Sequence, residues 1–224
     1  SDSLWFYNTT QGSGLMPYDL FIALEDSDST AYSQELLRSN QNMDKFRYLP
    51  QKVTKFNPDG LPIGFVKDSY QGNDYVGYTC AACHTSQVNY NGKAIRIDGG
   101  PAMADMNSFL AELEKSMIAT LEDTAGKQQR FIKNVLALKN DFNQPEQVVA
   151  SLQKWATTIR LYNTINHSHI KYGYARLDAF GRIYNRVLQH VINKEQLQNA
   201  MRLVLSPTGD RVLTDLQIND VLKG

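Results

Sequence analysis

The feature that most constrains this chain is the segment from Cys80 to His84, in which two alanines separate the only two cysteines and a histidine follows at once. Two residues between the cysteines allow one helical turn to bring both thiols to the same side, with the imidazole next to them. This spacing is the attachment signature of a c-type haem, in which each thiol forms a thioether with the porphyrin and the histidine reaches the iron. We therefore expect one covalent haem c, held by Cys80 and Cys83, with its iron bound by His84.

Two other uses of paired thiols stay open at this point. A disulfide or a thioredoxin-like redox pair has the same Cys-x-x-Cys spacing, but the βαβ context of a thioredoxin is not visible in the sequence. A zinc site would need a second pair of ligands. The chain has no third cysteine, and its other histidines lie far downstream, at His167, His169 and His190. Haem attachment is therefore the preferred interpretation of the motif.

The overall composition limits the partners and the location. Lys and Arg total 23, as do Asp and Glu, so no excess of positive charge favours nucleic acid or an anionic membrane surface as a partner. No run of residues reaches the roughly 18 apolar residues of a membrane-spanning helix. Because haem c is attached on the oxidising side of a membrane, we expect a periplasmic or secreted protein whose signal peptide has already been removed.

The spacing of apolar residues favours a mainly α-helical chain with one small β-hairpin. It predicts a short helix over residues 31–38, an irregular proline-rich loop over 46–64, and a hairpin around Asn91-Gly92, a pair that suits a type I′ turn. Apolar side chains then recur at helical spacing from Met106, and Pro145 begins another helix. Further helices are predicted downstream, over residues 177–191, 195–205 and 213–222.

We predict a single c-type haem domain over residues 1–224. In this scheme residues 1–79 are an N-terminal segment that wraps around the haem, residues 80–205 are the haem-binding helical core, and residues 206–224 are a C-terminal tail. The boundaries follow from the start of the motif and from the break at Ser206-Pro207-Thr208-Gly209.

The ligand on the second face of the iron decides what a haem can do. A Met or His there gives a saturated iron that suits electron transfer, whereas an open position permits reaction with peroxide or dioxygen. Met103, His167 and His169 are candidates for this sixth ligand, while Met106 fits core packing better. Arg96 is a candidate partner for the haem propionates, because it lies shortly after the motif and carries a positive charge.

Four blocks of the sequence resemble a known family. Together they are similar to the N-terminal haem half of the di-haem cytochrome c peroxidase superfamily, and within it most similar to the rubber oxygenase (RoxA-like) branch. The Asp-Gly-Gly-Pro and Arg-Leu-Asp-Ala-Phe-Gly stretches are the specific part of the resemblance, since the haem motif alone is shared by many proteins. The blocks are Gln11-Gly12-Ser13 with Leu15-Met16-Pro17-Tyr18-Asp19, then Tyr78 to Thr85, Ile95 to Ala102, and Ala175 to Arg182.

The resemblance implies a cytochrome c-like helical fold, a periplasmic or secreted enzyme, and a second haem in a C-terminal half. It also makes Phe180 and Asp178 candidates for lining or bracing the haem pocket. Because the sequence has no second Cys-x-x-Cys-His, the chain is a fragment of a longer di-haem protein, or the second haem belongs to another polypeptide, or one haem suffices. The better-known peroxidases of the superfamily supply a distal histidine soon after the motif. No histidine occurs here between His84 and His167, which favours an open or differently ligated iron.

The favoured interpretation is therefore a c-type haem domain of a peroxidase-type or dioxygenase-type oxidoreductase. It would use a small-molecule oxidant and share electrons with a redox partner protein or a second haem domain. The alternative is a non-catalytic electron-transfer cytochrome c with Met or His as the sixth ligand. The sequence does not identify which residues carry out catalysis.

Overall fold

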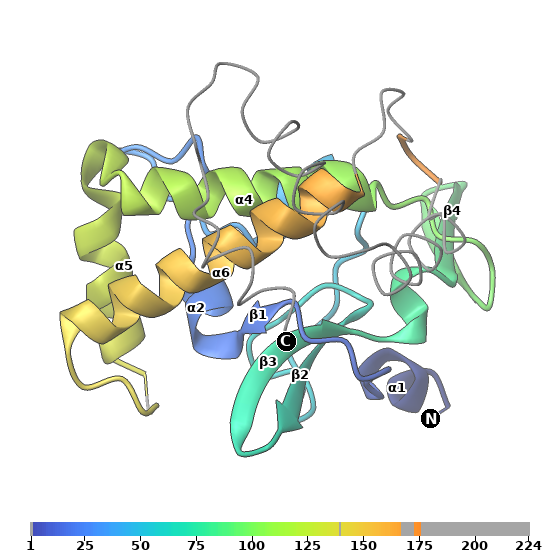
Figure 1. The fold of residues 1–224 in the computed structure, drawn as a ribbon. Helices are drawn as coiled ribbons and strands as arrows, with labels where there is room; N and C mark the ends of the chain where they lie inside the picture. Colours follow the sequence, from blue (N-terminus) through green and yellow to red (C-terminus); the bar gives the residue numbers. More distant parts are fainter. Residues whose placement is uncertain (1, 139, 167–172, 176–224) are drawn as a thin grey trace.

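The structure is a computed structural model, which describes residues 2–138, 140–166 and 173–175 (Figure 1). The predicted helices over 177–191, 195–205 and 213–222 and the predicted tail over 206–224 lie outside the described residues. Five strands and a series of helices make up the described part. In chain order they are α1 (Asp2–Asn8), β1 (Met16–Pro17), α2 (Tyr18–Ala23), α3 (Asn40–Lys45), β2 (Phe65–Tyr70), β3 (Asn73–Tyr78), the 3₁₀ turn η1 (Cys80–Ala82), β4 (Thr85–Tyr90), β5 (Lys93–Asp98), α4 (Met106–Leu121), the 3₁₀ turn η2 (Thr124–Gly126), α5 (Lys127–Leu136) and α6 (Pro145–Ile165).

A three-stranded antiparallel sheet has the strand order β1-β3-β2. Strands β2 and β3 form a hairpin whose two turn residues, Gln71 and Gly72, have φ angles of 50° and 79°. The short strand β1 pairs with the other edge of β3, where Met16 lies opposite Val76. The chain leading into β1 lies so close to β3 that a Cβ atom on Gly77 would fall 2.0 Å from the Ser13 carbonyl oxygen. Only glycine fits at this position.

The prediction of a mainly α-helical, cytochrome c-like fold with one small hairpin is wrong. Two antiparallel sheets are present, and the β2–β3 hairpin is the one that the sequence analysis missed. Strand β2 begins with buried residues and ends with exposed ones, so the alternation that reveals a strand is incomplete. Its turn residue Gln71 is also not one of the Asn, Asp or Gly residues that usually indicate a two-residue hairpin turn.

The hydrophobic core lies between the three-stranded sheet and helices α2, α4, α5 and α6. Phe65 is 1% exposed, and its ring contacts the rings of four other aromatic residues, Phe21, Tyr48, Tyr78 and Phe109. The core draws residues from Met16 to Ile159. The predicted wrapping segment (residues 1–79) and the start of the predicted helical core therefore share one hydrophobic interior.

Helices α4 and α6 lie side by side across one face of the molecule (Figure 1). Asn163 of α6 donates hydrogen bonds to the Leu110 carbonyl at 3.0 Å and to the Glu114 carboxylate at 2.8 Å. Helix α6 begins at Pro145 as predicted. The predicted apolar stripe of α4 is confirmed: Met106 packs partly buried against the core, and the remaining members are buried, namely Phe109, Leu110, Leu113 and Met117.

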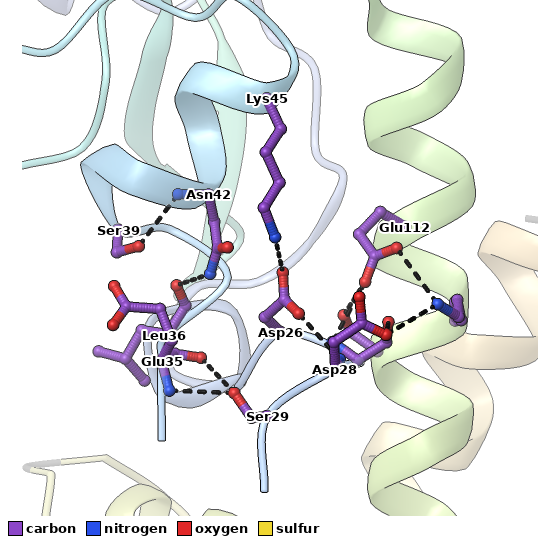
Figure 2. A network of polar contacts seen from close by, with 12 residues as sticks. Asp26, Asp28, Ser29, Glu35, Leu36, Ser39, Asn42, Lys45 and Glu112 are labelled. Carbon is purple, nitrogen blue, oxygen red and sulfur yellow. Dashed lines mark hydrogen bonds and ion pairs between the residues drawn. The ribbon is translucent and has the colours of Figure 1, made fainter. Parts of the chain in front are cut away.

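The predicted helix over residues 31–38 is wrong, because this stretch belongs to an irregular loop held by polar contacts (Figure 2). The amide of Asp26 donates to the Glu35 carbonyl at 2.9 Å, and the Ser29 hydroxyl donates to the same carbonyl while accepting from the Glu35 amide. Lys45 forms an ion pair with Asp26 at 3.1 Å. These partners satisfy backbone groups that a helix would otherwise pair internally. By contrast, the predicted irregular loop is confirmed, since residues 46–64 are all described and contain no helix or strand.

A buried lysine holds the same loop to helix α5. Lys127 is 1% exposed, and its ammonium group donates to the carbonyls of Asp26 and Ser27 at 2.6 and 2.8 Å. Burial lowers the pKa of Lys127, because the charged form loses its hydration. Nearby, Arg130 forms two 2.7 Å hydrogen bonds with the Glu25 carboxylate. Two charged side chains of helix α5, Lys127 and Arg130, therefore hold residues 25–27 to this helix.

Candidate functional site

The Cys80–His84 segment forms a helical turn between strands β3 and β4. The 3₁₀ turn η1 covers Cys80–Ala82, and the amide of His84 donates to the Cys80 carbonyl at 3.0 Å, so the turn continues to the histidine. Thr79 caps the turn, because its hydroxyl accepts a hydrogen bond from the Ala81 amide at 3.2 Å. The segment therefore forms the helical turn that its spacing allows.

The two alanines of the motif are packed inward. Ala81 is 2% exposed and lies against Tyr7 and Ile63, whereas Ala82 joins the main core. A Cβ atom on Gly64, whose φ is +95°, would fall 2.3 Å from the Cα atom of Ala82. The Cys80 and His84 side chains are exposed, whereas Cys83 is half-buried and packs against the main core.

Backbone hydrogen bonds join the first and the third of the blocks named above to the segment that contains this turn. From the first block, the Gln11 amide donates to the Tyr78 carbonyl at 3.1 Å. From the third, the Gly99 amide donates to the His84 carbonyl at 2.8 Å and the Ala102 amide donates to the Cys83 carbonyl at 2.9 Å. The fourth block begins at Ala175, whose amide donates to the carbonyl of Met103 at 3.3 Å, one residue beyond Ala102. Segments far apart in the sequence thus meet at the motif.

The hairpin that follows the motif confirms the prediction made from Asn91-Gly92. These two residues have φ angles of 47° and 73° and join strands β4 and β5, in which Val88 pairs with Ile95. One side of the hairpin faces the body of the protein. On that side a guanidinium nitrogen of Arg96 donates to the Pro50 carbonyl at 2.5 Å.

The same inner side of the hairpin is held to helix α1 by Asp98. Its carboxylate accepts a hydrogen bond from the Tyr7 hydroxyl at 2.6 Å and one from the Ser3 hydroxyl at 2.9 Å. Burial and the hydrogen bond to Asp98 raise the pKa of Tyr7 to about 12, since both disfavour the phenolate. The outer side of the hairpin carries Val88, Tyr90, Ile95 and Ile97, which are all exposed.

The predicted site residues fall into three groups. Cys80, Cys83 and His84 share one turn, as described above. Arg96 and Met103 lie close to that turn along the chain: Arg96 already bonds Pro50 and Gln87, and the side chain of Met103 is 53% exposed. The other candidates, His167, His169, Asp178 and Phe180, lie outside the described residues.

The donor groups around the motif do not form a metal site. Within the part of the chain that the structure describes, no three His, Cys, Asp or Glu side chains are grouped as ligands of a metal ion. No disulfide joins Cys80 to Cys83. Among the described helices, none combines the length and apolar character that a membrane span requires.

The sequence analysis missed the outer surface of the hairpin. The alternation of Val88 with Tyr90 and of Ile95 with Ile97 was visible, but a strand pattern usually indicates a face that packs on a core. The side that packs on the body is instead the polar one, with Arg96 and Asp98. The Asp-Gly-Gly-Pro stretch from Asp98 to Pro101 was also visible in the sequence. It ends the hairpin, and the amides of Gly99 and Ala102 at and after it hydrogen-bond to His84 and Cys83.

Comparisons with known proteins give little further guidance. No family model and no solved structure matches the chain. A similar curated protein, "Uncharacterized protein y4iJ" of Sinorhizobium fredii (strain NBRC 101917 / NGR234), is 28% identical over 209 aligned positions. The alignment covers 82% of this chain and 33% of the relative, so the chain spans about a third of that protein's length. The relative's name states no activity.

Proposed function

We propose that this chain is a c-type haem domain of an oxidoreductase, in which Cys80 and Cys83 hold the haem covalently and His84 binds its iron. The observation that carries the proposal is the helical turn at residues 80–84. Its alanines are packed inward, Cys80 and His84 are exposed, and Cys83 is half-buried against the hydrophobic core. A buried or strained turn could not present two thiols and an imidazole to one ligand.

The residues around the turn fit a haem in two further respects. The backbone of the turn is fixed by hydrogen bonds from Gly99 and Ala102, so the thiols and the imidazole start from a defined arrangement. Apolar side chains beside the turn are exposed, including Ile97 and Met103, and a porphyrin is a large apolar surface that such side chains can cover. When bound, the haem supplies one-electron and oxygen chemistry. The chain itself attaches and orients the haem and shields it from water.

A peroxidase-type or dioxygenase-type reaction with a small-molecule oxidant is the favoured activity. It is supported by the absence of any histidine between His84 and His167 in the sequence and by the backbone hydrogen bonds that join the first and third blocks to the motif segment. A redox partner or a second haem domain would exchange electrons with this haem. Because haem c is attached on the oxidising side of a membrane, the proposal includes a periplasmic or secreted location.

A second candidate function is a non-catalytic electron-transfer cytochrome c. One observation favours it: Met103 is half exposed next to Ala102, the residue that hydrogen-bonds to Cys83. Its thioether is therefore not committed to the core, unlike that of Met106, and is available as an iron ligand.

Covalent attachment is tested first. The chain is exported in a host that attaches c-type haem, denatured, and examined by mass and by haem-dependent staining on a gel. The wild type should carry one haem, and the Cys80→Ala/Cys83→Ala double variant should carry none. A Met103→Leu variant should keep the covalent haem and serves as the control for export and folding. A wild-type protein without covalent haem would refute the proposal and favour a redox pair.

The two activities are separated by the absorbance spectrum of the ferric protein. A high-spin spectrum that shifts on addition of cyanide or peroxide supports the oxidoreductase. A low-spin spectrum that ignores both reagents supports the electron carrier. If Met103 is the sixth ligand, Met103→Leu should convert the low-spin spectrum to a high-spin one.

A further inference from the structure

We propose that the outer side of the β4–β5 hairpin is the protein surface on which the haem packs. We call this surface the apolar face and define it by Val88, Tyr90, Ile95 and Ile97. The inference rests on the proposed function and adds the residues that would surround the haem, beyond the three that bind it.

The register of the hairpin gathers these side chains on one side. Val88 lies opposite Ile95, Ser86 lies opposite Ile97, and Tyr90 lies opposite Lys93. Directly paired residues share a side of a two-stranded sheet, and residues two apart along a strand do so as well. The four members of the apolar face are 51%, 66%, 51% and 45% exposed, in chain order. Adjacent large apolar side chains at such exposure indicate a binding surface rather than scattered surface residues.

The opposite side of the hairpin is occupied. Arg96 bonds the Pro50 carbonyl, and Asp98 accepts from Tyr7 and Ser3. These hydrogen bonds fix which side of the hairpin faces the protein, because a one-residue shift in register would break them and turn the isoleucines to that side. The apolar face is thus held outward by specific bonds.

The apolar face continues to the proposed iron ligand. The Gly99 amide donates to the His84 carbonyl at 2.8 Å, which extends the β4–β5 pairing by one residue beyond Thr85. Thr85 is 3% exposed and points into the protein, whereas His84 is exposed. Alternation therefore places the His84 imidazole on the same side as Ser86 and Val88, and successive residues on that side are about 7 Å apart along the strand.

This continuity identifies the occupant as the haem rather than a second protein. Of the three attachment residues, Cys80 and His84 are exposed, and Cys83 is half-buried against the core. A group bound through His84 and Cys80 would lie beside the start of the hairpin. Ile97, Ile95 and Val88 are the apolar side chains nearest to that position along the two strands. A porphyrin is rigid and largely apolar, so it can cover these side chains without ordering a flexible partner.

The test substitutes polar residues for three apolar side chains of the apolar face and examines the haem-loaded protein. The triple variant Val88→Thr/Ile95→Thr/Ile97→Thr keeps β-branched side chains in the strands but makes the face polar. Two variants serve as matched controls: Ala94→Ser, on the inner side of the same hairpin, and Tyr70→Ser, a 64% exposed aromatic residue at the end of the other hairpin. Thermal unfolding of each haem-free protein checks that the fold is kept.

The readouts are covalent haem per chain, circular dichroism in the Soret region, and the reduction potential. We expect the triple variant to keep covalent haem, to change the Soret dichroism, and to have a lower potential, because a polar and wetter site favours the oxidised iron. Both controls should match the wild type. A triple variant that matches the wild type in dichroism and potential would overturn the inference, as would one whose sole change is loss of a dimer. A wild type without covalent haem refutes the proposed function itself, which is a separate result.

Discussion

The two β-hairpins have nearly the same backbone and opposite roles. Each has two six-residue strands and a two-residue turn with positive φ at both positions, Gln71-Gly72 in one and Asn91-Gly92 in the other. Strand β3 gains a third strand and ends in buried residues, whereas every residue of β5 is exposed. The comparison teaches that the turn builds the hairpin, while the residues packed against its strands decide whether it is scaffold or accessible surface.

The largest difference should appear when one large side chain is removed from each hairpin. Phe65→Ala removes a ring packed against four others and should lower the free energy of unfolding by about 3–5 kcal/mol. Ile97→Ala in the haem-free protein should change it by less than about 1 kcal/mol, because Ile97 is 45% exposed and lies outside the core. Urea unfolding of the two variants measures both values. Equal losses would mean that the second hairpin is also part of the core.

A second comparison uses the glycines next to each hairpin. Gly64 precedes β2 and Gly99 follows β5, and both have positive φ, but a Cβ atom meets Ala82 at the first position and nothing within 4 Å at the second. Gly64→Ala should therefore destabilise the protein by about 1–3 kcal/mol more than Gly99→Ala. Because the clash falls on Ala82, within the turn proposed to attach haem, Gly64→Ala should also reduce covalent haem per chain if the proposal holds. Thermal unfolding and haem staining measure the two effects, and similar values for both variants would contradict the close packing at Ala82.

Substitutions in the two hairpin turns, at Gly72 and Gly92, should destabilise the protein by similar amounts. Gly72 and Gly92 have φ angles of 79° and 73°, with nothing within 4 Å of an added Cβ. Gly72→Ala and Gly92→Ala should each lower the free energy of unfolding by about 1–2 kcal/mol, because alanine is strained in the left-handed backbone conformation and no neighbouring atom adds a clash. Their unfolding midpoints in urea should agree. A much larger loss for one of them would reveal a contact specific to that turn.

The smallest effect concerns the attachment of the second hairpin to helix α1. Tyr7→Phe removes the hydrogen bond to Asp98 and should lower the free energy of unfolding by about 1 kcal/mol near neutral pH. The pKa of Tyr7 is raised from 10.0 to about 12, so the stabilisation is fully present below pH 10 and is lost as the pH rises from 10 to 12. The difference in stability between wild type and Tyr7→Phe should therefore shrink over this range. Unfolding at pH 9 and pH 11 measures it, and a constant difference would exclude titration of Tyr7.

Sequence patterns predicted the elements whose signals are local. Asn91-Gly92 specifies its turn by backbone preference alone, and the stripe from Met106 to Met117 repeats often enough to indicate a buried helix face. The turn at Cys80 to His84 follows from its short spacing. These features do not depend on distant partners.

The missed features depend on residues far away in the chain. Residues 31–38 do not form a helix because Asp26, Ser29 and Glu35 are bonded to one another, and the first of these is also held by Lys45 and Lys127. Strand β2 is half polar because only its first residues face the aromatic core. The apolar face could not be recognised because alternation shows that a strand has two different sides, but not which one is turned to solvent.

The hydrogen bonds around the motif also bear on the order in which the chain is made. Gln11, Gly99 and Ala102 donate the backbone hydrogen bonds described for residues 78–84, and Gly64 accepts one from the Thr79 amide at 2.9 Å; all four precede helix α4. During synthesis from the N-terminus, the hydrogen-bonding partners of the cysteines are therefore available before α4, α5 and α6 emerge. If the chain attaches haem as proposed, the thioethers would form on a turn whose partners come early, while the ring of Phe109, which completes the packing of Phe65, comes later with the helices.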